Sequence, residues 1–328
     1  LEACGGKHHR LPLASRTPWS ILFCAWRLIH IIRENNIDLV HARSRAPAWA
    51  SFIACKLTKT KFITTFHGSH KIQNCFKWFY NSVMVRGERV IAISEFIRQH
   101  IVANYRIPIE RIDVAPRGFD PLIFDPALFS DQDRRELRES FGIKPDELVI
   151  SMPGRLTRWK GQTVFLRALA EIKNLPWQAL LIGGAGQKIA YEEELKLLAM
   201  ELGITNRVKF LGSRSDIARY YAVSDLVVSA STEPEAFGRV AIEAQAMAKP
   251  IIASAHGGSL ETVRDGLSGW LFTVSDVEDL AEKLSVALSE PEKLGMVGLT
   301  GRKLVAESFT VEQMCKAEWR VYSAFASE

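Results

Sequence analysis

Two glutamates, Glu235 and Glu243, stand eight positions apart in the segment SASTEPEAFGRVAIEAQAMAKP (229–250). We expect a strand to end before Glu235 and a helix to begin near Gly238, so the pair spans about two helical turns, or roughly 12 Å. One carboxylate can then face a reacting sugar while the other reaches a pair of ribose hydroxyls, and free backbone N–H groups at Gly238 could face a phosphate. An acidic helix start with a buried, satisfied Glu243 accounts for the same residues equally well.

A second segment, SMPGRLTRWKGQ (151–162), places basic residues directly after an expected strand. The strand ends in a turn at Gly154, and Arg155 and Lys160 follow in one loop. Arginine offers a two-pronged fork to phosphate oxygens and lysine a mobile point charge, so the loop could clamp a diphosphate. Taken alone, basic residues at a strand end more often face solvent.

The first half of the chain has two further strand-end candidates. His67 follows the expected strand in TTFHGSH (64–70), and Arg43 and Arg45 lie in the loop HARSRAP (41–47). His67 has a structural interpretation and a functional one, and the two arginines are either acceptor contacts or exposed loop charges.

The charge of the chain is uneven along its length. Residues 1–130 contain 18 Lys and Arg against 9 Asp and Glu, whereas the remaining residues contain 24 against 28. A basic first half suits an anionic partner, and a phosphate-bearing lipid, a membrane surface and nucleic acid all fit that description. The aromatic and basic segment 71–89 could lie on such a membrane, although a helix docked on the core is the favoured interpretation. A plainly solvated basic surface explains the charge equally well.

Short β-branched runs alternate with amphipathic helical stretches, which predicts an α/β fold with two doubly wound parallel sheets. The expected strands occupy 37–42, 61–68, 89–94 and 111–118 in the first half, then 147–154, 177–184, 207–212, 225–231 and 249–258. We expect a first domain over 1–130, a linker with one short helix over 131–146, and a second domain over 147–308. A last helix within 309–328 is expected to pack back on the first domain.

Composition favours an ordinary globular protein, with 47% hydrophobic and 24% charged residues. The five cysteines are scattered, with no CxxC pair and no metal-ligand spacing, which favours a reducing cytoplasm and predicts no metal site. No apolar run approaches the roughly 18 uncharged residues that span a bilayer. The chain opens with LEACGGKHHRLPL, which reads like the middle of a fold, so we expect an N-terminal segment to be missing.

These segments, in this order, resemble glycosyltransferase family 4, whose retaining enzymes have the GT-B fold of two Rossmann-like domains facing a cleft. Glu235…Glu243 with AFG between them, GRLTRWKGQ, and AHGGSLETVRDGLSGWLF (255–272) carry the resemblance in the second half. HARSRAP, TTFHG, VIAISEFI and VAPRGFDPLIFDP carry it in the first half and look like members from Gram-negative bacteria.

The resemblance implies a role for each candidate. Arg155 and Lys160, after Gly154, would bind the donor diphosphate and stabilise the departing nucleoside diphosphate. Glu235 would contact the transferred sugar, and Glu243 would hold the ribose hydroxyls. Backbone amides around Phe237 and Gly238 would contact the phosphate. His67 would approach the sugar from the other domain. No cofactor or metal is implied, because the basic pair and the helix dipole neutralise the leaving charge.

The function so implied is transfer of a hexosyl unit from a nucleotide sugar to a lipid-linked or lipopolysaccharide acceptor. It would take place in the cytoplasm, with peripheral association at the inner membrane and no nucleic-acid partner. Two alternatives stay open: a nucleotide-sugar epimerase of the same fold, and a catalytically inactive sugar-nucleotide-binding subunit. The family's usual first strand and glycine-rich loop are absent from the sequence, and Lys249 replaces the usual glycine before Pro250.

Overall fold

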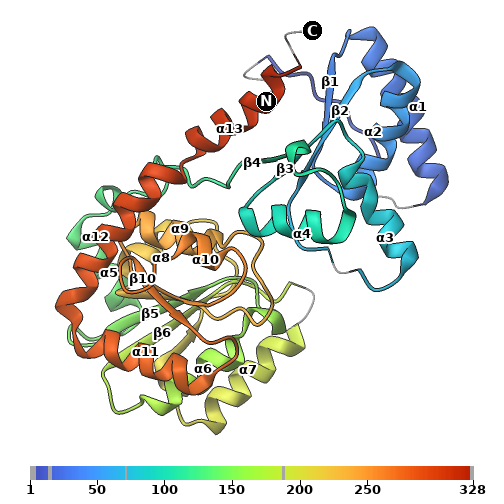
Figure 1. Ribbon diagram of the computed structural model, residues 1–328. Coiled ribbons are helices and arrows are strands. Elements are labelled where there is room, and N and C mark those ends of the chain that lie inside the picture. The colour runs from blue at the N-terminus through green and yellow to red at the C-terminus, as the bar shows by residue number, and fades with distance from the viewer. Residues whose placement is uncertain (1–4, 14–16, 71, 187–188, 326–328) are drawn as a thin grey trace. The chain divides into compact units, whose positions relative to one another are not determined.

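The computed structural model describes residues 5–13, 17–70, 72–186 and 189–325 and divides the chain into two compact units (Figure 1). The first unit comprises Leu1–Pro116 and Cys315–Glu328, and the second unit comprises Arg117–Met314. Each unit has its own parallel sheet. The predicted α/β class with parallel sheets is therefore confirmed, and the doubly wound strand order is seen in the second sheet.

The first unit contains a four-stranded sheet in the order β1-β2-β3-β4. Its strands are β1 (Leu39–Ala42), β2 (Lys61–Phe66), β3 (Arg89–Ala92) and β4 (Ile112–Val114). The helices are α1 (Pro18–Glu34), α2 (Arg45–Thr58), α3 (Cys75–Ser82) and α4 (Glu95–Tyr105). The Ser94 hydroxyl accepts a hydrogen bond from the Ile97 N–H, which is the N-cap that starts α4.

The second unit contains a six-stranded sheet in the order β10-β9-β8-β5-β6-β7. Its strands are β5 (Leu148–Pro153), β6 (Trp177–Ile182), β7 (Val208–Phe210), β8 (Leu226–Ser229), β9 (Ile251–Ser254) and β10 (Gly269–Phe272). Its helices are α5 (Asp131–Ser140), α6 (Gln162–Glu171), α7 (Ile189–Glu201), α8 (Ile217–Val223), α9 (Arg239–Ala246), α10 (Ser259–Thr262), α11 (Val277–Ser289) and α12 (Pro291–Ser308). The strand β10 was not predicted from the sequence.

This strand order reverses between β5 and β8, where the chain leaves one side of the sheet and returns on the other. In doubly wound folds such a switch point opens a crevice at the carboxyl ends of the two strands, and ligands bind there. The strand order therefore predicts that a ligand binds at the loops that follow β5 and β8.

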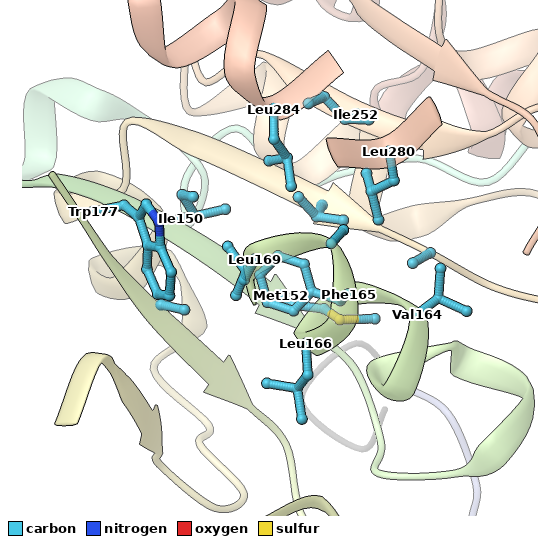
Figure 2. Packing of buried hydrophobic residues seen from close by; sticks show 14 of the residues in the cluster. Ile150, Met152, Val164, Phe165, Leu166, Leu169, Trp177, Ile252, Leu280 and Leu284 are labelled. Carbon is cyan, nitrogen blue, oxygen red and sulfur yellow. The ribbon is translucent and has the colours of Figure 1, made fainter. Parts of the chain in front are cut away.

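A large apolar core holds the second sheet in place (Figure 2). Ile150 and Met152 of β5 pack with Phe165 and Leu169 of α6, and Leu284 of α11 joins the same cluster. All five side chains are buried, and burial of each contributes about 1.5–3 kcal/mol to folding. The core thus anchors β5 rigidly behind the loop that carries Arg155 and Lys160.

The predicted domain boundaries need correction. Segment 117–130 belongs to the second unit, because the Phe119 N–H donates to the Phe309 carbonyl (2.9 Å) and the Val311 N–H donates to the Phe119 carbonyl (2.9 Å). The expected linker 131–146 also belongs there, since Arg138 of α5 forms an ion pair of 3.2 Å with Asp225.

The last helix, α13 (Val311–Ser323), carries the chain from one unit to the other. Its Val321 lies in an apolar cluster with Ile63, Ile91 and Ala115 of the first unit. None of the helices in the described ranges is both long and apolar enough to span a membrane.

Candidate functional site

Three loops of the second unit meet at the carboxyl ends of β5, β8 and β9. The first loop approaches the end of β8 so closely that a Cβ on Gly161 would lie 1.8 Å from the Ala230 carbonyl oxygen. Gly161 has φ +74°, a conformation that glycine adopts readily. The Thr232 N–H donates to the Trp159 carbonyl at 2.7 Å. These backbone contacts place Lys160 beside the loop that carries Glu235.

The third loop, which follows β9, packs against the other side of the segment that carries Glu235. The Gly258 N–H donates to the Glu235 carbonyl at 2.8 Å, and a Cβ on Gly257 would lie 2.5 Å from that carbonyl oxygen. A Cβ on Gly258 would lie 2.4 Å from the Cα of Phe237. The two glycines of AHGGSLE are therefore needed because backbone packs directly on backbone.

Lys160 and Glu235 form an ion pair of 2.5 Å between Nζ and Oε1. Both side chains are mostly buried, with exposed fractions of 15% and 14%. The Ser231 hydroxyl also donates to the Glu235 carboxylate, at 2.6 Å. A paired and hydrogen-bonded carboxylate at the switch point is held in one orientation, as a group that positions a ligand must be.

Gly154 and Arg155 lie on the same loop as Lys160. Gly154 has φ +148°, and a Cβ at this position would lie 3.8 Å from the Lys160 side chain. Arg155 is exposed, and its carbonyl accepts a hydrogen bond of 3.0 Å from Gln162. Arg158 points elsewhere, because it pairs with Glu194 of α7 at 2.6 Å. Arg158 is thus engaged by α7, and Arg155 and Lys160 remain the candidate residues of this loop.

Glu243 lies on α9, which begins after Gly238 (φ +89°). Its carboxylate accepts hydrogen bonds from Arg239 (2.7 Å) and from the Tyr221 hydroxyl (3.2 Å). Burial raises the pKa of Glu243, and the Arg239 cation and the Tyr221 hydroxyl oppose that shift. Phe237 is buried with its ring 5.5 Å from that of Phe309, so only its backbone is suited to meet a ligand.

Sequence reasoning missed three residues of this site. Ser231 holds Glu235, Tyr221 holds Glu243, and His256 Nε2 lies 2.9 Å from the Ser231 carbonyl. Burial lowers the pKa of His256, so the neutral ring donates from Nε2 to that carbonyl. The spacing of Ser231 and Glu235 was a usable signal, whereas nothing local in the sequence connects Tyr221 with Glu243.

The candidates of the first half lie in the first unit and contact other groups there. Arg43 forms an ion pair with Glu318 of α13, and Arg45 donates to the Asn81 side-chain oxygen at 2.9 Å. His67 is half-buried directly after β2. Arg43 therefore has a structural partner that the loop sequence did not reveal.

The aromatic and basic segment continues over residues 72–89, and residue 71 lies outside the described residues. One of its side chains contacts the rest of the first unit, whereas others are exposed. Trp78 of α3 donates to the Asn104 carbonyl at 3.1 Å, whereas Phe76 is 82% exposed and Phe79 is 53% exposed. Both interpretations of this segment thus retain support.

A groove of about 570 Å³ in the second unit is lined by side chains of α5, of α8 and of residues 122–129. It contains none of the predicted site residues. Over the described ranges, no group of three or more His, Cys, Asp or Glu side chains is arranged to hold a metal ion.

Family models match both units of the chain. The model described as "Glycosyl transferases group 1" matches residues 133–304, and "Glycosyltransferase Family 4" matches residues 3–121. A D-inositol 3-phosphate glycosyltransferase of Mycobacterium marinum is 37% identical over 203 residues, which cover 61% of this chain and 42% of that protein. The chain spans about half the length of the curated relatives it matches.

Solved structures agree with this family. A glycosyltransferase from Rickettsia africae has a TM-score of 0.88 and 35% identity, covering 98% of this chain and 84% of that one. Anabaena HepE in complex with UDP and glucose has a TM-score of 0.82 and 26% identity, covering 93% and 81%. The GT-B fold class is thereby confirmed, and the chain belongs to the group 1 glycosyl transferases, with a family 4 segment in its first half.

Proposed function

We propose that this protein is a retaining glycosyltransferase that takes its sugar from a nucleotide-sugar donor bound in the second unit. The observation that carries the proposal is the Lys160–Glu235 ion pair at the switch point between β5 and β8. The HepE structure supports it, because that related protein holds UDP and glucose.

The donor diphosphate would be bound by Arg155 and Lys160. Without a donor, Lys160 is neutralised by Glu235. An incoming diphosphate competes for the ammonium group and leaves the Glu235 carboxylate available for sugar hydroxyls. When the glycosidic bond breaks, negative charge grows on the leaving phosphate oxygen, and cations already fixed beside it stabilise that charge.

The nucleoside end of the donor would reach Glu243. Arg239 and Tyr221 hold this carboxylate in place, so its remaining acceptor capacity can take the two ribose hydroxyls. Backbone N–H groups at Phe237 and Gly238, at the start of α9, would face the phosphates. Arg155, Lys160, Glu235 and Glu243 are thus proposed to bind successive parts of one donor, and no metal is needed.

We propose that the acceptor is a lipid-linked or lipopolysaccharide saccharide that meets the first unit, with His67 reaching the transferred sugar. The excess of basic residues in 1–130 supports an anionic acceptor or membrane surface. Exposed aromatic side chains on α1 and α3, such as Trp19 (81% exposed) and Phe76 (82% exposed), support peripheral contact with a bilayer. The reaction would then occur on the cytoplasmic side of the membrane.

The donor half of the proposal is tested with Glu235→Gln and Lys160→Met in the purified protein. Donor turnover is followed by mass spectrometry over a panel of nucleotide sugars, and nucleotide binding by calorimetry. We expect Glu235→Gln to lower turnover about 100-fold or more with nucleotide binding retained, and Lys160→Met to weaken both. Turnover of Glu235→Gln at the wild-type rate would refute the assignment.

A further inference from the structure

Buried polar groups without partners gather in one place in the first unit. Among the described residues, Asn81 Nδ2, His100 Nε2 and Tyr105 Oη are buried and have no hydrogen-bond partner. The rings of His100 and Tyr105 lie 6.1 and 5.9 Å from that of Phe66, and the His70 ring lies 4.9 Å from it. A buried polar group left unpaired costs about 1–3 kcal/mol, so three together indicate that something else binds there.

The unpaired groups are donors. Asn81 uses its side-chain oxygen to accept from Arg45, which leaves its NH₂ group. The Asn104 amide lies 3.3 Å from His100 Nδ1, so that nitrogen accepts and Nε2 carries the hydrogen. The Asn81 amide also faces the Tyr105 hydroxyl, without a hydrogen bond of good geometry between them. A matching ligand must therefore present several acceptor oxygens.

The guanidinium of Arg45 places a positive charge near His70. The pKa of His70 is lowered to about 4, first by burial and then by Arg45, His100 and His67. Among the described residues that shift the pKa of His70, none is a carboxylate. Arg45 begins α2 shortly after β1, and His70 follows β2, so both follow the carboxyl ends of two neighbouring strands of the first sheet.

We propose that Arg45, His70, Asn81, His100 and Tyr105 form an anion site that binds a phosphate group. Arg45 and His70 are partly exposed and form its rim, whereas Asn81 and Tyr105, with exposed fractions of 0% and 7%, form its floor. A single water molecule has two acceptor positions, fewer than the donors of this anion site, whereas a phosphate group has three or four oxygens. In the proposed reaction, this phosphate belongs to the acceptor. Only this assignment of the phosphate rests on the proposed function.

The anion site is tested by titrating the whole protein with inorganic phosphate, with a sugar phosphate such as glucose 6-phosphate, and with vesicles that contain phosphatidylglycerol. Binding is measured by calorimetry and by the ring resonance of His70, assigned with His70→Gln. We expect saturable binding that shifts this resonance and weakens about tenfold in Arg45→Gln, because a hydrogen bond to a charged group is lost. Lys56→Gln removes one positive charge from an exposed position near the C-terminal end of α2, outside the helices proposed to contact a membrane, and should bind like wild type.

Each outcome decides the question. A soluble probe that depends on Arg45 identifies a free phosphorylated acceptor, and vesicle binding alone that depends on Arg45 identifies a lipid headgroup. No Arg45-dependent binding in any arm, or equal loss in Lys56→Gln, would overturn the anion site. UDP binding, which belongs to the second unit, should be the same in Arg45→Gln as in wild type, so failure of the donor proposal would be recognised separately.

Discussion

The two units differ in how their buried polar groups are paired. In the second unit, Lys160 is paired with Glu235, and the backbone at Gly161 and Gly257 is locked against neighbouring loops. At the carboxyl edge of the first unit, Asn81 and His100 keep buried donors without acceptors. A site whose charges are already satisfied is rigid before its ligand arrives, whereas a site of unpaired donors reaches its full stability only with a ligand bound.

The largest expected effect tests whether close backbone contact shapes the second unit's site. Gly161→Ala forces a Cβ into the Ala230 carbonyl and should lower the free energy of unfolding of this unit by about 3 kcal/mol or more, measured by denaturant titration. Gly203→Ala is the matched control, since Gly203 has a similar φ of +71° with open space around it, and it should cost only about 1 kcal/mol. Equal costs would show that contact with β8 is unimportant.

The next effect concerns Arg43, whose pair with Glu318 joins α13 to the first unit. Arg43→Gln leaves a carboxylate that is only 7% exposed without its cation, and we expect a loss of about 1–2 kcal/mol in this unit. Faster amide hydrogen exchange in α13 would accompany it. Adding Glu318→Gln should restore part of the stability. If Arg43→Gln instead raised the KM for the acceptor at unchanged stability, Arg43 would be an acceptor contact, as the sequence suggested.

A smaller effect comes from a charge at the opposite edge of the second unit's sheet. Burial lowers the pKa of Lys249 to about 8, aided by Arg134 and Arg138 and opposed by Asp225. Between pH 8 and the usual lysine pKa of about 10.4, the unfolded chain binds more protons, so stability should rise with pH. At pH 7, Lys249→Met should stabilise by about 1 kcal/mol in thermal unfolding, a gain that shrinks as the pH rises above about 8.

Lys303→Met serves as the control for Lys249, because Lys303 is exposed on α12 of the same unit. It should leave the melting temperature and its pH dependence unchanged. A gain in stability as large as that of Lys249→Met would assign the effect to net charge instead of burial.

The smallest expected effect distinguishes the Arg158–Glu194 ion pair from the Lys160–Glu235 ion pair. Both the arginine and the lysine lie in the loop after β5. Arg158 and Glu194 have side chains that are 73% and 49% exposed, so Arg158→Gln should change stability by less than about 0.5 kcal/mol. Donor turnover should stay within about twofold of wild type. A loss comparable to that of Lys160→Met would place Arg158 in the donor site.

Much of the fold could be read from local patterns. The β-branched runs predicted nine of the strands, because each forms a short apolar stretch that ends in a glycine or polar turn. The strand β10 (Gly269–Phe272) escaped prediction, since four residues within a glycine-rich segment carry little periodicity. The domain boundary was misplaced because the pairing of Phe119 with Phe309 and Val311 joins segments nearly 190 residues apart.

The sequence by itself determined the α/β class, the order of the elements and the chemical types of the residues proposed to bind the donor, because these depend on periodicity and on short motifs. Only the tertiary structure decided that Lys160 pairs with Glu235, that Tyr221 supports Glu243 and that Arg43 holds α13. His100 and Tyr105 of α4 likewise approach Phe66 of β2, and Asn81 of α3 meets Arg45 of α2, only through tertiary packing. Which partners a polar group finds depends on contacts between distant segments, and local sequence patterns do not encode them.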